Sequence, residues 1–234
     1  MARCLELGGK GAGFVSPNPM VGCVIVYKNR IIGEGYHQKY GGNHAEVNAI
    51  NMVKNKKELV GATLYVNLEP CCHFGKTPPC CELIVKVGIS SVVIGSKDSS
   101  KKVNGLGIKY LQDNNVKVKV GLLKKKSLEL NKRFFTYHQK NRPYIILKWA
   151  ETKDGFMDIV RNGKKKEINW ISSENSKTMV HQWRAHEDAI LVGRTTVEND
   201  NPKLTVRKVK GINPVRVILD PNLKLGSDYN IFDN

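Results

Sequence analysis

The sequence predicts an α/β protein, and three features of the chain support this fold class. From residue 60 onward, short apolar segments that suit strands alternate with segments whose apolar residues recur at helical spacing. Of the 234 residues, 41% are hydrophobic and 25% are charged, which is typical of globular domains. A polar segment that ends in proline, residues 137–143, separates two parts of the chain, so we expect two domains.

The N-terminal part predicts a helix, a β-hairpin and a second helix. Residues 2–9 have the apolar spacing of a helix end with no capping residue before it, so we expect the chain to begin within an element. After a stiff Ser-Pro-Asn-Pro turn, the β-branched run at 20–27 and the segment at 31–36 predict two paired strands. Residues 44–54 then carry apolar side chains near helical spacing.

The rest of the first part alternates between strands and helices. A proline pair before residue 80 fixes the entry of one of these helices. The strands are predicted at residues 62–68, 91–95 and 116–120, and the helices at residues 80–87, 105–113 and 124–138. This order of elements places the first domain at residues 1–140.

The second part, residues 141–234, is short for an α/β domain. It predicts strands at residues 144–150, 189–192 and 215–219 and a helix at residues 173–185. It ends soon after a strand, without a helix to close the layer. We therefore expect this domain to be incomplete and to leave a sheet edge bare.

Composition and the N-terminus exclude several classes of protein. No apolar run approaches the ~18 residues that cross a bilayer, and the first residues contain no apolar signal-peptide core. We therefore expect a cytoplasmic protein with no membrane partner. Six cysteines are too few for a disulfide scaffold, and four of them form two adjacent pairs, which favours metal binding or catalysis.

The chain is strongly basic, with a formal net charge of +17. This charge fits a nucleic-acid partner, an anionic small substrate, or surface lysines with no specific role. The lysines are scattered and lack the interleaved aromatic residues of a base-stacking surface. We therefore expect a small anionic partner and no nucleic acid.

One histidine and two cysteines in the first part have the chemistry of a zinc site. His44, Cys71 and Cys80 are ligand types that zinc takes, and three protein ligands leave a fourth tetrahedral position open, as in catalytic sites. Glu46 lies about 200° around a helix from His44, since each residue turns ~100°, so it is not an obvious ligand. If the helix N-terminus points at the metal, Glu46 can instead accept and return protons beside an activated water.

The two adjacent cysteine pairs leave the choice of ligands open. Cys71 and Cys80 each follow a proline that shapes a turn, which favours them, but Cys72 and Cys81 have the same spacing. A closed structural site, in which a further cysteine supplies the fourth ligand, is another alternative.

The loop between the cysteine pairs carries groups that can bind a phosphate or a ribose. Eight residues separate Cys71 from Cys80, where zinc deaminases in general have two. His73, Lys76 and Thr77 can each donate to such a group, or the loop is only a solvated turn.

The order His-x-Glu, Pro-Cys, Cys is the signature of zinc-dependent nucleobase deaminases. In that chemistry water attacks a ring carbon that bears an amine, and the glutamate moves protons until ammonia leaves. Asn18, held between two prolines on a stiff turn, could read the edge of such a base, or it could only form the turn.

Longer motifs make the chain resemble the RibD family of riboflavin-biosynthesis enzymes. The most characteristic of them is the cysteine loop with its Gly-Lys-Thr-Pro-Pro-Cys run. The matching segments are residues 16–22, 44–46 and 69–81 in the first part, and residues 148–150, 154–155, 170–172 and shorter matches between 184 and 207 in the second. The resemblance therefore covers nearly the whole chain.

The resemblance implies a bifunctional enzyme. Its first, three-layer cytidine-deaminase-like domain would use zinc to remove the 2-amino group of 2,5-diamino-6-(5-phosphoribosylamino)pyrimidin-4-one by hydrolysis. Residues 141–234 would form the N-terminal part of a dihydrofolate-reductase-like α/β domain. That domain would reduce the ribosyl group of the product, 5-amino-6-(5-phosphoribosylamino)uracil, with NADPH. We also expect a homo-oligomer, a dimer or a tetramer.

The resemblance also assigns roles to individual residues, with Glu46 as the proton shuttle. Zinc would be held by His44, Cys71 and Cys80, and the deaminase substrate would contact Asn18, His73 and Lys76. NADPH would contact Ala150, Trp170, Thr196 and Asp200, and the reductase substrate would contact Arg184, Leu204 and Arg207, the arginines through its phosphate. The chain departs from the family at Ile168 and Pro221, where serine is usual.

Two other functions remain open on the sequence. The net charge favours an enzyme that edits nucleic acid, such as a tRNA adenosine deaminase, although the eight-residue loop and the second domain disfavour it. A zinc-stabilised binding module without activity is the other alternative, and it predicts that Glu46 is dispensable.

Overall fold

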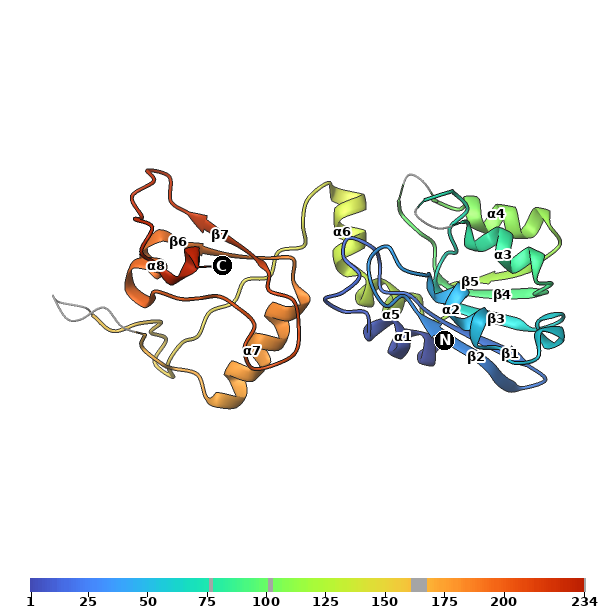
Figure 1. Ribbon diagram of the computed structural model, residues 1–234, viewed down its shortest axis with the longest axis horizontal. Coiled ribbons are helices and arrows are strands. Elements are labelled where there is room, and N and C mark those ends of the chain that lie inside the picture. The colour runs from blue at the N-terminus through green and yellow to red at the C-terminus, as the bar shows by residue number, and fades with distance from the viewer. Residues whose placement is uncertain (76–77, 101–102, 161–167, 234) are drawn as a thin grey trace. The chain divides into compact units, whose positions relative to one another are not determined.

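The structure is a computed structural model that describes residues 1–75, 78–100, 103–160 and 168–233 (Figure 1). The chain divides into two compact units, Met1–Ile145 and Ile146–Asn234. Within the described residues, no helix combines the length and the apolar character that crossing a membrane requires.

A five-stranded sheet forms the centre of the first unit, with the strand order β2-β1-β3-β4-β5 (Figure 1). Strand β1 runs antiparallel to β2 and to β3, whereas β3, β4 and β5 are parallel. The strands are β1 (Gly22–Tyr27), β2 (Arg30–Tyr36), β3 (Thr63–Leu68), β4 (Ser91–Ser96) and β5 (Lys117–Val120). The predicted hairpin is present, and its turn places Lys28 and Asn29 at positive φ, the conformation that matches the twist of paired strands.

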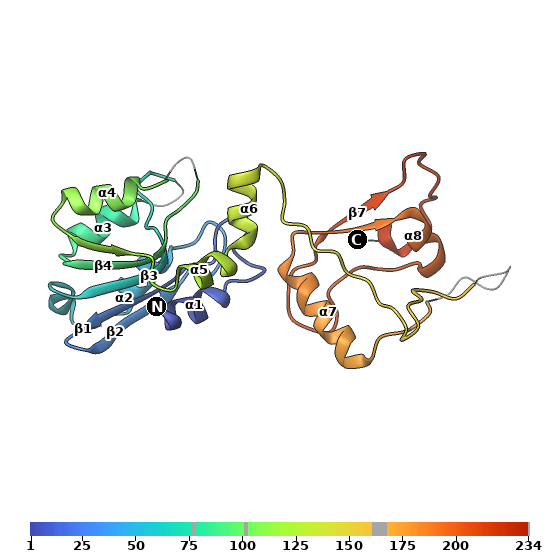
Figure 2. The ribbon, with the colours of Figure 1, turned by 180° about the vertical axis from the view of Figure 1, so that it is seen from behind.

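Helices cover both faces of this sheet and give the first unit three layers (Figures 1 and 2). One face carries α2 (Ala45–Met52), α3 (Cys80–Lys86) and α4 (Leu106–Asp113), and a short 3-10 turn, η1 (Lys56–Leu59), follows α2. The other face carries α1 (Ala2–Gly9) and α5 (Lys124–Leu130), which is followed by α6 (Lys132–Lys140).

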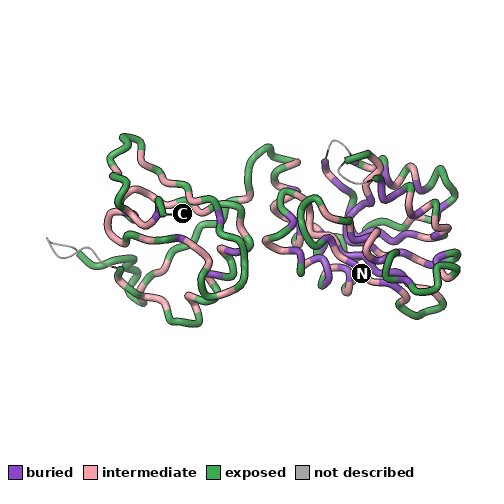
Figure 3. Tube along the Cα trace, in the orientation of Figure 1, coloured by how far each residue is buried: buried purple, intermediate pink, exposed green. Residues whose placement is uncertain are grey.

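The strand residues of the first unit alternate between two hydrophobic clusters. Cys23 and Ile25 of β1 pack on the side of α2, α3 and α4, whereas Val24 packs with Cys4 and Leu7 of α1. Figure 3 shows the resulting concentration of buried residues along the central strands and the inner faces of the helices. Because the central strands are covered on both faces, they form continuous apolar runs in the sequence.

Two glycines of β2 allow α2 to lie against the sheet at close range. A Cβ atom at Gly35 would lie 2.4 Å from the backbone nitrogen of Ala49, and one at Gly33 would lie 2.4 Å from its carbonyl oxygen. Both distances are shorter than any tolerable contact, so only glycine fits. This packing fixes the start of α2, where His44 lies.

The second unit contains a two-stranded parallel sheet of β6 (Ala189–Gly193) and β7 (Val215–Leu219). Its helices are α7 (Glu174–His186), α8 (Arg194–Asp200) and the 3-10 turn η2 (Asn230–Phe232). One face of the sheet packs on a cluster centred on Val197, Leu204 and Ile231. The other face is exposed and apolar, and it consists of Leu191, Val215, Val217 and Leu219.

The predicted helix at 124–138 is wrong in one respect, because the structure divides it into α5 and α6 at Asn131. The Asn131 side chain reaches the backbone of Met20, where Oδ1 accepts from the N–H at 2.7 Å and Nδ2 donates to the carbonyl oxygen at 3.0 Å. A contact between residues so far apart along the chain is not visible in local periodicity.

The predicted strand at 144–150 is also wrong, because these residues form neither strand nor helix. Their apolar side chains are exposed, with Leu147 at 78% and Trp149 at 60%. A strand is stabilised by pairing and by burial of one face, and this segment has neither within the described part of the chain. Helix α8, which the structure adds, was not predicted because its seven residues contain a single buried apolar side chain, Val197.

Candidate metal centre and active site

Three side chains that are far apart in the sequence lie together in the structure: His44, Cys71 and Cys80. We call this group the metal cluster. His44 Nδ1 is 3.4 Å from Cys71 Sγ and 3.3 Å from Cys80 Sγ, and the three ligand atoms all lie within 4.8 Å of one another. His44 caps the start of α2, Cys71 follows the end of β3, and Cys80 is the first residue of α3. The turn formed by Pro79 sets the direction from which α3 begins.

The spacing of these three atoms fits a tetrahedral zinc ion. With Zn–S bonds of about 2.3 Å and a Zn–N bond of about 2.0 Å, tetrahedral angles place nitrogen and sulfur about 3.5 Å apart. The two observed N–S distances, 3.4 and 3.3 Å, lie close to that value. One imidazole and two thiols are also a donor set that zinc prefers, so the residues present fit the metal.

The first cysteine of each adjacent pair is the one that lies beside His44. Cys81 is fully buried, and its thiol donates to the carbonyl oxygen of Cys71 at 2.9 Å instead of joining the cluster. Among the described residues, the only group of side chains arranged to hold a metal ion is the His44, Cys71 and Cys80 set. The alternative pair, Cys72 and Cys81, is therefore not favoured.

Hydrogen bonds within the cluster favour the ionised form of Cys71. The Cys80 thiol and the His44 ring lower the pKa of the Cys71 thiol well below its usual value. The backbone N–H of Cys80 also points at Cys71 Sγ from 3.4 Å. Since the thiolate is the form that binds metal, Cys71 is prepared for coordination.

Glu46 lies beside the cluster on the first turn of α2 and is only 3% exposed. Burial raises the pKa of its carboxyl group. A buried carboxyl next to a metal ligand set, but outside it, is suited to taking up and returning a proton.

Glu69 holds the end of β3 in place, a role that the sequence analysis missed. Its buried carboxylate accepts hydrogen bonds from the backbone N–H groups of Asp98, Gly105 and Ile108, at 3.0 to 3.1 Å. These bonds tie the residues just before Cys71 to the start of α4. A carboxylate two residues before a cysteine ligand, in a Glu-Pro-Cys sequence, is the signal that could have identified it.

His37 connects Asn18 to the metal cluster and was also missed. Asn18 Nδ2 lies 3.0 Å from His37 Nε2, and His37 Nδ1 lies 2.9 Å from the carbonyl oxygen of Asn43. Burial lowers the pKa of His37. Because a carbonyl oxygen can only accept, Nδ1 donates to Asn43, and Nε2 can then accept from Asn18. The His37 ring meets the His44 ring edge-on, with centroids 5.5 Å apart. Its position directly after β2 was the available signal.

The cysteine loop contributes a buried nitrogen with no partner. His73 Nδ1 is buried and makes no hydrogen bond to any described residue. Lys76, the other residue of this loop expected at the substrate, lies outside the described residues.

In the second unit, two arginines converge on Thr205. One Arg184 N–H donates to the Thr205 carbonyl oxygen at 2.6 Å, and one Arg207 N–H donates to its hydroxyl oxygen at 2.9 Å. Burial, with the charge of Arg207, lowers the pKa of Arg184, whose Nε is buried without a partner among the described residues. The Arg207 backbone N–H also donates to the ring of His181. Positive charge is therefore concentrated at this point.

The residues expected to bind NADPH do not converge on one point as the two arginines do. Thr196 and Asp200 lie one turn apart on α8 and so share a face of it. Trp170 is exposed, with Lys177 Nζ 3.6 Å above its ring, and Ala150 lies outside helices and strands. The side chain of Leu204, expected at the reductase substrate, is instead part of the hydrophobic cluster, and its backbone has a positive φ.

Comparisons with known proteins agree with this arrangement. The profile of the cytidine and deoxycytidylate deaminase zinc-binding region matches residues 1–96, and that of the RibD C-terminal domain matches residues 143–234. The riboflavin biosynthesis protein RibD of Aquifex aeolicus is 44% identical over 226 residues, which are 96% of this chain and 62% of that protein. The diaminohydroxyphosphoribosylamino-pyrimidine deaminase of Buchnera aphidicola subsp. Schizaphis graminum is 52% identical over 135 residues, 58% of this chain and 90% of that protein.

The chain belongs to the RibD family. A RibD-family crystal structure, the deaminase/reductase from Thermotoga maritima, matches with a TM-score of 0.91 and 44% identity over 100% of this chain and 66% of that one. The predicted fold class, α/β with a three-layer cytidine-deaminase-like domain followed by a second α/β domain, is confirmed, and the second domain matches the RibD C-terminal domain. The chain spans about three fifths of the length of the curated RibD relatives that it matches.

Proposed function

We propose that the first unit is a zinc-dependent deaminase of riboflavin synthesis that acts in the cytoplasm on 2,5-diamino-6-(5-phosphoribosylamino)pyrimidin-4-one. The observation that carries this proposal is the convergence of His44, Cys71 and Cys80, with the buried carboxyl of Glu46 beside them. The Buchnera relative, 90% of which the chain matches, bears the name of this deaminase.

The chemistry follows from the roles of these four side chains. His44 Nδ1 and the Sγ atoms of Cys71 and Cys80 would hold the zinc ion, which when bound would supply Lewis-acid activation of water near neutral pH. Glu46 accepts a proton from the attacking water and passes it to the neighbouring ring nitrogen, while the oxygen bonds to the carbon that bears the 2-amino group. Glu46 then carries the second proton to that amine, the C–N bond breaks, ammonia leaves, and a carbonyl group remains.

Residues around the cluster are suited to orient the pyrimidine and its phosphoribosyl group. The Asn18 amide uses one N–H on His37, so its carbonyl oxygen can accept from the pyrimidine edge. We assign the phosphoribosyl group to His73, whose Nδ1 is buried without a partner in the described residues, and to Lys76.

The proposed deaminase is tested by measuring ammonia release from the purified protein. We expect release from the phosphoribosylaminopyrimidine and none from tRNA, even at equal concentration of reactive bases. Release from tRNA alone would establish nucleic-acid editing instead. A zinc-loaded protein that releases ammonia from neither would leave the binding module as the better account.

We propose that the second unit contributes to the NADPH-dependent reduction of the deaminated product. Arg184 and Arg207 supply the positive charge that its phosphate requires, and Thr196, Asp200, Trp170 and Ala150 are assigned to NADPH. The backbone of Leu204, rather than its buried side chain, is the part that can contact substrate.

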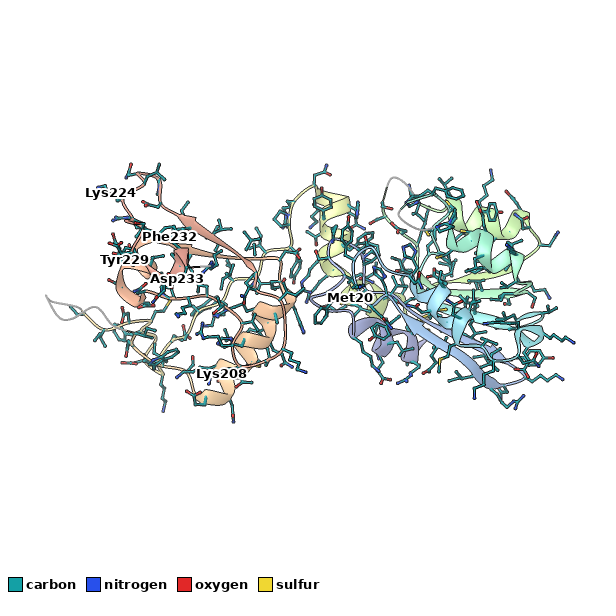
Figure 4. The ribbon with its side chains drawn as sticks, in the orientation of Figure 1. Met20, Lys208, Lys224, Tyr229, Phe232 and Asp233 are labelled. Atoms are coloured by element: carbon teal, nitrogen blue, oxygen red, sulfur yellow. The ribbon has the colours of Figure 1, made fainter. Side chains whose placement is uncertain are left out.

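The Arg207→Ala variant tests the phosphate assignment. We expect it to weaken calorimetric binding of 5-amino-6-(5-phosphoribosylamino)uracil to the second unit by at least about tenfold, because a charge-assisted hydrogen bond is lost. The neighbouring Lys208, labelled in Figure 4, already pairs with Glu174, so Lys208→Ala is the control and should change the affinity less than about twofold. Equal effects of the two variants would contradict the assignment.

We also propose that the chain forms a homo-oligomer, a dimer or a tetramer. The exposed apolar face of Leu191, Val215, Val217 and Leu219 is a surface that would be covered on association. Light scattering should give a mass of two or four chains, and the mass of one chain at micromolar concentration would refute the proposal.

A further inference from the structure

Two buried asparagines hold the backbone of Met20 from different elements. Asn131, at the break between α5 and α6, accepts from the Met20 N–H at 2.7 Å and donates to its carbonyl oxygen at 3.0 Å. Asn67 of β3 donates to the same carbonyl oxygen at 3.0 Å, and its own oxygen accepts from the N–H of Gly22 at 2.7 Å. Both asparagines are at most 2% exposed, so their ends of these bonds are shielded from water.

Met20 lies two residues after Asn18, on the segment that leads from the Ser-Pro-Asn-Pro turn into β1. Figure 4 labels Met20 on the side of the first unit that carries α5 and α6. From this segment Asn18 reaches His37, whose ring meets the ring of His44. A continuous series of contacts therefore runs from the break between α5 and α6 to the metal cluster.

The side chain of Asn131 does not serve the helices that it separates. It makes no capping hydrogen bond to either α5 or α6, although asparagine is a common cap. Its φ of −104° and ψ of 25° interrupt what would otherwise be one helix. Both polar atoms of its side chain are used on Met20. Helix formation alone therefore does not account for an asparagine at this position.

We propose that Asn131 is a positioning residue of the deaminase, which holds the turn of Asn18 at the distance from the metal cluster that substrate binding requires. This inference rests on the proposed deaminase function. It assigns α5 and α6 a part in the site, although neither helix supplies a residue that contacts the ligand set. Loss of the Asn131 side chain would loosen the turn, because Met20 would keep the bond from Asn67 to its carbonyl oxygen but lose both bonds to Asn131. It would leave His44, Cys71 and Cys80 in place.

The test compares Asn131→Ala with Asn114→Ala. Asn114 also follows a helix, but it is exposed, and among the described residues its side chain donates to Tyr110 of the preceding helix, α4. We expect Asn131→Ala to raise KM for the pyrimidine by about tenfold or more, with kcat changed less than about threefold, because both hydrogen bonds from Asn131 to Met20 are lost. Zinc should remain at one per chain. Asn114→Ala should leave both constants within about twofold.

Two further measurements separate positioning from general stability. Amide hydrogen exchange of the segment around Met20 should become faster in Asn131→Ala and stay unchanged in Asn114→Ala. In a double-mutant cycle, Asn131→Ala should add less than about twofold to KM once Asn18 is alanine, since both residues act through the same turn. If Asn131→Ala does not fold, Asn131→Asp should show the same pattern, because it retains the acceptor for the Met20 N–H but places a carboxylate oxygen against the Met20 carbonyl oxygen.

Two results would overturn the inference while the deaminase proposal stands. One is an active parent protein in which Asn131→Ala behaves like Asn114→Ala. The other is a full, additive effect of Asn131→Ala in the Asn18→Ala background, which would show that Asn131 acts through stability alone. A parent protein that loads zinc and releases no ammonia would instead refute the proposed function, and the inference with it.

Discussion

The Glu46→Gln variant is expected to release ammonia about 10³-fold more slowly than the parent protein while retaining one zinc ion per chain. Glutamine has nearly the same shape as glutamate but cannot take up a proton from the attacking water. Glu46 is buried beside the ligand cluster without belonging to it, so the metal ligands are unchanged. The rate of ammonia release and the zinc content of the same sample are the two measurements required.

Glu82→Gln is the matched control for this variant. Glu82 lies in the first turn of α3, as Glu46 lies in the first turn of α2, but its side chain is exposed. We expect the rate of Glu82→Gln to stay within about twofold of the parent. A Glu46→Gln protein as active as the parent would exclude the proton-transfer role, and a slow one without zinc would show that Glu46 supports the metal site instead.

Zinc binding should depend on the first cysteine of each pair and not on the second. We expect Cys71→Ser and His44→Ala to weaken zinc binding by at least about 100-fold and to lose ammonia release with it, because two protein ligands cannot hold the ion well. Cys72, the adjacent residue, is partly exposed and outside the cluster, so Cys72→Ser should keep both zinc and activity. Elemental analysis of the purified variants gives the metal content directly.

Removal of zinc should also lower the thermal stability of the first unit. The three ligands join the starts of α2 and α3 to the end of β3, and an ion that binds only the folded state stabilises it. A chelator should therefore lower the melting temperature of the parent protein and have no further effect on His44→Ala. If Cys72→Ser loses zinc and Cys71→Ser does not, the assignment of the ligands is wrong.

The residues of the metal cluster could be predicted because each of them lies in a short sequence motif. The His-x-Glu and Pro-Cys motifs each place a candidate ligand at the end of a helix or strand. One imidazole and two thiols, those of His44, Cys71 and Cys80, then limit the kinds of metal ion that can bind. Spacing alone could not choose between the adjacent cysteines, since both choices give the same gap. The fold favours Cys71 and Cys80, because it directs the Cys81 thiol to the carbonyl oxygen of Cys71.

The contacts of the supporting residues could not be predicted, because their partners are distant along the chain. Asn131 interrupts a regular helical pattern in order to reach Met20, and Glu69 accepts bonds from backbone groups beyond β4. His37 stands in a polar segment with no motif of its own. The apolar run around Leu147 has the composition of a strand, but a strand also needs a neighbour, and composition does not show whether one is present.

The most direct test of the whole account is anomalous X-ray scattering at the zinc absorption edge, from crystals grown without chelators. We predict one peak per chain in the first unit, about 2.0 Å from His44 Nδ1 and about 2.3 Å from the Sγ atoms of Cys71 and Cys80. Absence of a peak, or a peak bound by Cys72 or Cys81, would contradict the proposed metal centre and the deaminase mechanism that depends on it.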